Sequence, residues 1–317
     1  MIRMLYQDDD TTFESPATAG SIGLLGFLRR SLKKQWRDYR SDFARCRRKF
    51  SEKSVHQFRI ESRRLLSTLS VLRAVVSRRR LDAAHRVLKK RLRVFARLRD
   101  THVQLLAIEE LTREFPQLAP FRKHLAKREH RLTKRVARKL KHTRLRSVAK
   151  PVALISKELR RLRAERDQEQ KEHAPVMATL DASFESVAVR YRAIDPLEPT
   201  TIHRTRVAFK EFRYMAEALQ PMLPGATDRV VGRMRDYQAR MGEIQDATVL
   251  RAGLEKYLAK GEEPMPDAAR IRAELERRKT ALTQAFLNQA DELFSFAPPK
   301  LLVSTTRVRA GTKHPSR

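Results

Sequence analysis

The chain has 317 residues, of which 41% are hydrophobic, so it has enough apolar content to build a core. Its formal net charge of +32 is far beyond what solubility requires and indicates a polyanionic partner. The single cysteine, Cys46, excludes an intramolecular disulfide and a cysteine-based zinc site, and the lack of any run of about 18 apolar residues excludes a membrane span.

The two ends of the chain differ in composition from the rest. Residues 1–20 are polar and contain Pro16 and Gly20, so we predict a disordered arm. The start of this arm has no long apolar run, so we expect no secretory signal and a cytoplasmic protein. Residues 297–317 contain a Pro-Pro pair and several cations, which predicts a disordered basic tail.

Between the ends we expect helix, because glycine is scarce, at 9 residues. In residues 21–50, apolar positions recur every three or four residues, which predicts an amphipathic helix with a basic outer surface. The apolar-poor stretch 167–172 predicts a junction between two helical units, at 21–166 and 174–296. The same periodicity predicts further helices at residues 54–77, 81–99, 105–115, 121–142, 148–166, 176–194, 200–219 and 268–296. It also predicts a helix at 228–244, followed after residues 245–249 by another that ends at about residue 257.

One motif occurs twice, in the helices predicted at 54–77 and 200–219. In each copy a histidine follows an apolar residue, an arginine comes three positions later, and another cation comes four positions after that. At about 100° per residue, these three side chains share one side of the helix and the apolar residues share another. The motif residues are His56, Arg59, Arg63 and Arg64 in the first copy and His203, Arg206, Lys210 and Arg213 in the second.

The duplication continues beyond the motif helices. Asp100 and Asp246 follow the two copies in the same order, each three residues before a valine. A tandem duplication of a helical unit predicts two similar bundles that face each other. We expect each aspartate to cap the start of a helix or to pair with an arginine, with orientation of the basic cluster as the alternative role.

A further basic stripe lies on the helix predicted at 81–99. Its cations are spaced so that they fall on one face of the helix. This stripe is not repeated in the second half, so it is a weaker candidate for anion binding than the motif helices. Its residues are Arg86, Lys90, Arg93 and Arg97.

Several cations on one helical stripe repel one another, and an anion whose charge is spread along a line would relieve that repulsion. Arginine offers a fork that matches phosphate oxygens, lysine a point charge, and histidine a group that becomes charged beside phosphate. Ordinary alternatives are a solvated basic face or histidines satisfied within a core. No repeated carboxylate lies on the stripes, so we predict no metal site, no catalytic residue and no cofactor.

Three classes of polyanion match this charge: nucleic acid, an anionic membrane surface and inorganic polyphosphate. Aromatic residues make up only 7% of the chain and Trp36 is the only tryptophan, so no base-stacking platform is visible. Non-specific nucleic-acid binding through the basic helix at 121–142 remains an alternative. So does an enzyme that processes polyphosphate or phosphate esters through His56 or His203.

At these motifs the sequence resembles the CHAD family, the conserved histidine α-helical domains, over about residues 22–296. The resemblance implies two four-helix bundles related by a pseudo-twofold axis, with a basic channel or groove between them. It also implies binding of inorganic polyphosphate, often at polyphosphate granules, through the eight motif residues. One departure is Leu66, where family members often have arginine.

Many members of that family are joined to a CYTH-type triphosphate hydrolase, and no such domain is recognisable in this sequence. The sequence therefore predicts an all-α, non-enzymatic protein whose partner is inorganic polyphosphate. It predicts no membrane partner and gives no indication of oligomeric state.

Overall fold

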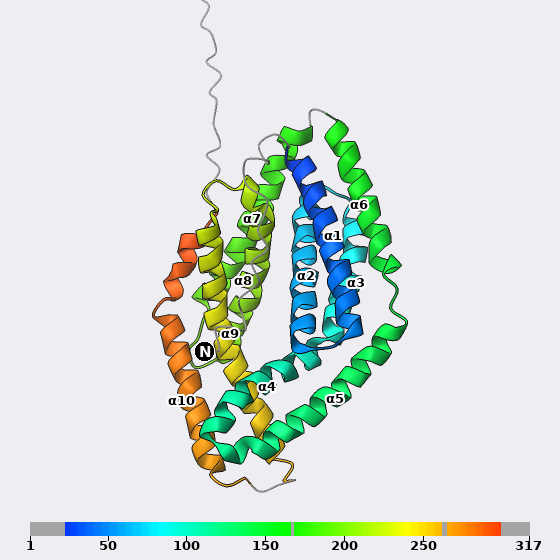
Figure 1. Ribbon diagram of the computed structural model, residues 1–317. Helices are drawn as coiled ribbons and strands as arrows, with labels where there is room; N and C mark the ends of the chain where they lie inside the picture. Colours follow the sequence, from blue (N-terminus) through cyan, green and yellow to red (C-terminus); the bar gives the residue numbers. More distant parts are fainter. Residues whose placement is uncertain (1–22, 166–167, 262–264, 299–317) are drawn as a thin grey trace, which may run out of the picture.

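The computed structural model describes residues 23–165, 168–261 and 265–298. Every regular element in these residues is helical, which confirms the predicted all-α class (Figure 1). The predicted N-terminal arm, and all but the start of the predicted C-terminal tail, lie outside the described residues. None of the described helices is both long and apolar enough to cross a membrane.

Four helices of the first half pack together. Their apolar stripes meet in a core in which Phe58, on the first motif helix, contacts the rings of Tyr39, Phe43 and Phe95. The motif helix starts where the Ser51 side chain accepts a hydrogen bond from the backbone N–H of Ser54, an N-cap. The four helices are α1 (Leu24–Arg48), α2 (Glu52–Val71), α3 (Arg78–Val94) and α6 (Arg146–Ala164).

The second half forms a corresponding group around Phe209 and Tyr237, whose ring centroids lie 4.8 Å apart. The helix predicted at 268–296 is two elements, because the chain turns after Leu287 and continues as a 3-10 helix. Tyr237 holds this turn in place by donating a hydrogen bond of 2.9 Å to the carbonyl oxygen of Ala290. The elements are α7 (Gln168–Arg192), α8 (Pro199–Leu219), α9 (Asp228–Leu258), α10 (Ala268–Leu287) and η6 (Ala290–Phe296).

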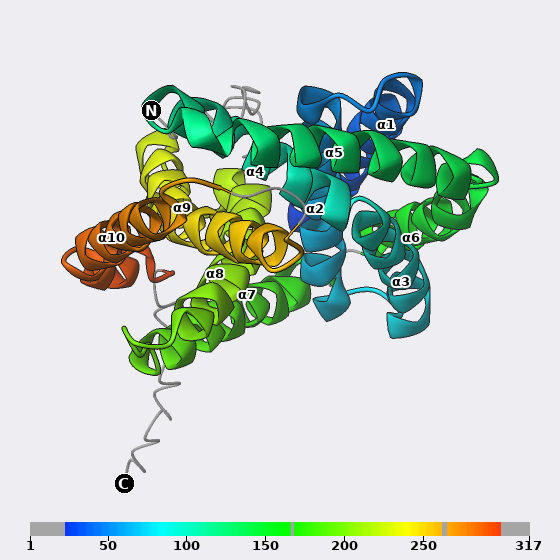
Figure 2. The ribbon, with the colours of Figure 1, turned by 90° about the horizontal axis from the view of Figure 1, so that it is seen from below.

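Two helices of the first half, α4 (Ala96–Glu114) and α5 (Ala119–Lys141), extend away from its core. They run across the lower end of the molecule in Figure 1, and Figure 2 shows them from that end. There they form a second core with the end of α9 and the start of α10, in which Phe121 packs on Tyr257. The two predicted units therefore share a core, and their pseudo-twofold relation stays a prediction.

The two motif helices are neighbours, because α2 packs directly against α8 along the centre of the molecule (Figure 1). Short 3-10 turns follow several helices, and two of them end the motif helices. These turns are η3 (Leu72–Ala74), η4 (Pro116–Leu118) and η5 (Gln220–Met222). The packing of α2 on α8 brings the repeated basic stripes to the same place.

Candidate functional site: a basic cavity between the motif helices

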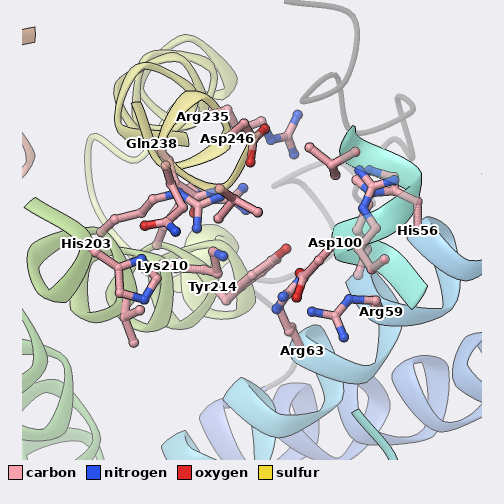
Figure 3. Close-up of a pocket in the computed structure, with 18 residues that line it drawn as sticks. His56, Arg59, Arg63, Asp100, His203, Lys210, Tyr214, Arg235, Gln238 and Asp246 are labelled. Carbon is pink, nitrogen blue, oxygen red and sulfur yellow. The ribbon is translucent and has the colours of Figure 1, made fainter. Parts of the chain in front are cut away.

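A cavity of about 370 Å³ lies between α2 and α8, and residues of α4 and α9 complete its wall. Figure 3 shows Arg59 and Arg63 on one side of it and His203 and Lys210 on the other. Seven of the twelve predicted binding residues line this cavity, together with both predicted aspartates. These seven are His56, Arg59, Arg63, His203, Arg206, Lys210 and Arg213.

The α2 side of the cavity holds two arginines in different ways. Arg59 donates a hydrogen bond of 3.0 Å to the carbonyl oxygen of Leu92, in the last turn of α3, where helix carbonyls carry partial negative charge. Burial and then the nearby Arg63 charge lower the pKa of Arg59 to about 9, so it is still a cation at neutral pH. Arg63 forms no hydrogen bond or ion pair within the described part of the chain. Burial is the main cause of its lowered pKa, and the Arg206 charge lowers it further.

On the α8 side, too, burial and neighbouring cations lower the pKa of the basic groups. Lys210 has a pKa well below its ordinary value, first because of burial and then because Arg206 and Arg63 are near. Within the described residues its ammonium group makes no hydrogen bond or ion pair. His203 also has a lowered pKa, from burial and then from Arg206, although a hydrogen bond with Gln245 partly offsets this. These groups are therefore less easily charged than they would be in water.

Arg213 differs from its neighbours because its charge is balanced. Only 1% exposed, it donates to Glu217 at 2.5 Å and to Gln238 at 3.0 Å. Its guanidinium carbon also lies 4.3 Å from the centroid of the Tyr214 ring, a cation–π contact. Glu217 accepts a second hydrogen bond, of 3.1 Å, from Arg235. This network fixes the wall of the cavity.

Asp100 and Asp246 also lie in the cavity wall, and neither caps a helix. Asp100 is in the second turn of α4, which starts at Ala96, and Asp246 is in the middle of α9. The expectation of a cap was wrong because no helix begins at either aspartate. Burial raises the pKa of Asp100 and the Arg59 charge opposes that rise, so the two side chains interact. The alternative role, orientation of the basic cluster, stays a prediction.

The described residues give the cavity a clear excess of positive charge. Seven Lys or Arg side chains line it, against two Asp side chains. Glu52, paired with Arg99, and Glu217 raise the number of nearby carboxylates to four. Three positive charges are then left over, before either histidine is protonated.

The other predicted residues lie elsewhere. Arg64 points into the first bundle, where it forms a buried ion pair of 2.7 Å with Glu61. The predicted basic stripe is exposed, does not line the cavity, and its role in anion binding stays a prediction. It consists of Arg86, Lys90 and Arg93 on α3 and Arg97 on α4.

Sequence reasoning missed several residues of the cavity wall. Arg99 and Gln245 immediately precede the repeated aspartates, so the repeat itself was a signal for them. Tyr214 extends from α8 toward the α2 side of the cavity (Figure 3). No sequence pattern indicated that Tyr214, Arg235 or Gln238 would line the cavity. No group of three or more potential metal ligands is found in the described part of the chain.

The family model of the CHAD domain matches residues 30–255, well over half of the chain. The chain belongs to the CHAD family. This confirms the resemblance seen in the two motifs, which both lie within the matched residues. No curated protein matches the sequence.

A solved CHAD structure supports the same fold. The crystal structure of the CHAD domain from the plant Ricinus communis matches with a TM-score of 0.60. The match covers 88% of this chain and 94% of the plant chain, at 18% sequence identity. At that identity the likeness establishes the fold alone.

Proposed function

We propose that this CHAD protein binds inorganic polyphosphate in the cavity between α2 and α8, without catalysing its breakdown. The observation that carries the proposal is the meeting of Arg63 and Lys210. These two half-buried cations come from opposite motif helices, and neither forms an ion pair within the described residues. Association with polyphosphate granules is part of the same proposal.

The electrostatics of the cavity favour an anion over an empty state. Burial and the nearby Arg206 charge lower the pKa of both Arg63 and Lys210, and the Arg63 charge lowers the pKa of Lys210 further. An anion between them would replace this repulsion with charge-assisted hydrogen bonds, which are roughly twice as strong as neutral ones. The cost of holding cations together in the free protein would then be recovered on binding.

The size of the cavity favours a single chain of phosphates. A cavity of about 370 Å³ is small beside a B-DNA duplex, whose major groove alone is ~12 Å wide. A duplex therefore does not fit inside the cavity. A bare phosphate chain carries its charge along a line and has no bases to accommodate.

One observation favours a second candidate function. The lowered pKa of His203 keeps its imidazole neutral at neutral pH, and a neutral imidazole can accept a proton as a general base. An enzyme that cleaves polyphosphate or phosphate esters with His203 or His56 would use this property. Release of phosphate from polyphosphate in the presence of a divalent metal would support it, and intact polyphosphate after long incubation would support binding alone.

The binding proposal is tested by polyphosphate titration at near-physiological salt with duplex DNA as competitor. The test variant is Arg63→Ala/Lys210→Ala. The matched control is Arg86→Ala/Lys90→Ala, which removes the same charge from exposed positions on α3.

Loss of two charge-assisted contacts is expected to weaken binding by about 100-fold or more in the test variant. The control should stay close to wild type, and DNA should compete poorly with polyphosphate for the wild-type protein. Equal weakening of the two variants would mean that net charge alone does the binding.

A further inference from the structure

The excess positive charge is concentrated in one half of the molecule. Residues 23–165 contain 43 Lys and Arg against 12 Asp and Glu, a net charge of +31. Residues 168–261 and 265–298 together contain 19 against 18, a net charge of +1. The central cavity takes its cations from both halves, so it does not account for this asymmetry.

A groove of about 340 Å³ between α1 and α6 lies in the basic half. Both helices belong to the first bundle, on the right of the molecule in Figure 1. The groove and the central cavity have no lining residue in common. Among the described residues that line it, the groove has four cations and no carboxylate, and the cations are Arg29 and Lys33 from α1 and Lys157 and Arg160 from α6.

These four cations make no hydrogen bond or ion pair within the described residues. The Nε atom of Arg29 is buried and has no hydrogen-bond partner among the described residues, which is unfavourable unless a group outside them accepts from it. Other basic residues nearby are neutralised, as Arg80 is by Glu158. The groove thus has the composition expected of an anion site.

The groove also contains Trp36, the only tryptophan of the chain. The side chain is half-buried and its ring stacks on Tyr39, with centroids 5.7 Å apart and 19° between the planes. Tyr39 is held by a 2.7 Å hydrogen bond from Arg91 to its hydroxyl oxygen. Trp36 is therefore mounted on a rigid support beside the four groove cations, and the guanidinium carbon of Arg40 also lies 5.8 Å from its ring centroid.

An aromatic ring among cations matches a ligand that has both bases and phosphates. Polyphosphate has no base and would gain nothing from the indole. We propose that the α1/α6 groove binds single-stranded nucleic acid, with a base against Trp36 and phosphates on Lys33, Lys157 and Arg160. This site is separate from the polyphosphate cavity and does not depend on it.

A path for further nucleotides leads away from the groove. Lys157 and Arg160 also line a neighbouring groove, where α6 meets the start of α3 beside Ser77 and Arg161. The strand would cross α6 at the two shared cations. A polymer would use both grooves, whereas a single nucleotide would use only the one with Trp36.

Because Trp36 is the only tryptophan, the intrinsic fluorescence of the protein reports on this groove directly. We expect a single-stranded oligothymidylate to quench the fluorescence, with an affinity that falls as salt is raised. Polyphosphate at the same phosphate concentration should leave it nearly unchanged. Absence of quenching by the oligonucleotide at low salt, or equal quenching by polyphosphate, would overturn the proposal.

Two further experiments test whether the groove binds a nucleic-acid strand rather than a single nucleotide, and whether binding uses the indole as well as charge. ATP should quench much more weakly than the oligonucleotide at the same nucleotide concentration, and equal quenching would mean a mononucleotide site instead. Trp36→Leu should bind a labelled oligonucleotide about tenfold more weakly, the scale of one base-stacking contact. Unchanged binding by Trp36→Leu would contradict a role for the indole.

A matched pair of variants tests whether the groove or the overall charge is responsible. Lys157→Glu/Arg160→Glu reverses two charges in the groove, and Arg138→Glu/Lys139→Glu reverses two exposed charges on α5. The groove variant is expected to lose at least tenfold more oligonucleotide affinity than the α5 variant. Equal losses would overturn the proposal. Arg63→Ala/Lys210→Ala should keep its oligonucleotide binding, so failure of one site is distinguishable from failure of the other.

Discussion

The central cavity and the outer surface of the first half are both basic, but they hold their cations in different ways. In the cavity, Arg59, Arg63 and Lys210 are half-buried, and burial together with neighbouring cations lowers the pKa of each. On the outer surface, cations such as Arg86 and Lys90 extend into solvent. Exposed charges are screened by water and salt, so they interact weakly with each other and with ligands.

The difference shows that net charge is a poor guide to where an anion site lies. Residues of the second half carry almost no net charge, yet they provide four of the seven Lys and Arg side chains in the cavity. The cavity differs from the surface because its cations are partly buried, so each charge without a partner there raises the free energy of the folded protein. Removing a charge should therefore have large effects in the cavity and small ones on the surface.

The largest difference in stability between the cavity and the surface is expected when a carboxylate is removed from each. Glu217 is 2% exposed and balances Arg213 and Arg235, so Glu217→Ala leaves a buried cation without its partner. We expect this to lower the free energy of unfolding by about 3–5 kcal/mol. Asp82→Ala, which breaks an exposed pair with Arg73, should cost less than about 1 kcal/mol. Urea unfolding of both variants measures their free energies of unfolding. A similar decrease in the two variants would contradict the prediction.

A smaller effect is expected from pH. The pKa of His203 is lowered in the folded protein, so the unfolded chain binds a proton more readily as the pH falls through about 6.5. The free protein should lose stability over that range, while its affinity for polyphosphate rises because the bound anion favours the charged imidazole. His203→Gln should reduce both trends. Thermal unfolding and binding measured across this range check the prediction, and an unchanged pH dependence in the variant would count against it.

The smallest effect concerns Asp100, whose charge opposes that of an incoming anion. Asp100→Asn removes this charge and leaves Arg59 with less competition. We expect polyphosphate to bind more tightly by up to about tenfold, on the scale of one charge interaction near a protein surface. Weaker binding in this variant, measured by the same titration, would mean that Asp100 acts mainly by orienting Arg59.

Much of this picture could be predicted from the sequence, because helices and repeats leave strong local patterns. The all-α class, the two motif helices and seven of the cavity residues follow from periodicity and from the repeated His–Arg–cation spacing. Arg64 and Arg63 are adjacent in the sequence, and only the packing of α2 shows that Arg64 turns toward Glu61 in the first bundle. The caps expected at Asp100 and Asp246 failed because a local pattern does not fix where a helix begins.

Features that depend on long-range packing could not be predicted. Trp36 reads as one more apolar position in α1 until α6 places Lys157 and Arg160 beside it. Likewise, Arg235 and Gln238 enter the site only because α9 packs against α8. The shared core of α4, α5, α9 and α10 joins residues more than a hundred positions apart and has no local signal.

The central claim is that the cavity holds cations under mutual repulsion that an anion relieves. Thermal unfolding of wild type and of Arg63→Gln/Lys210→Gln, each with and without polyphosphate, tests it most directly. We predict that the variant unfolds at a higher temperature than wild type without ligand and that polyphosphate then stabilises it little, while wild type is stabilised by several degrees. Arg86→Gln/Lys90→Gln should behave as wild type does. A variant less stable than wild type, yet equally stabilised by polyphosphate, would contradict the claim.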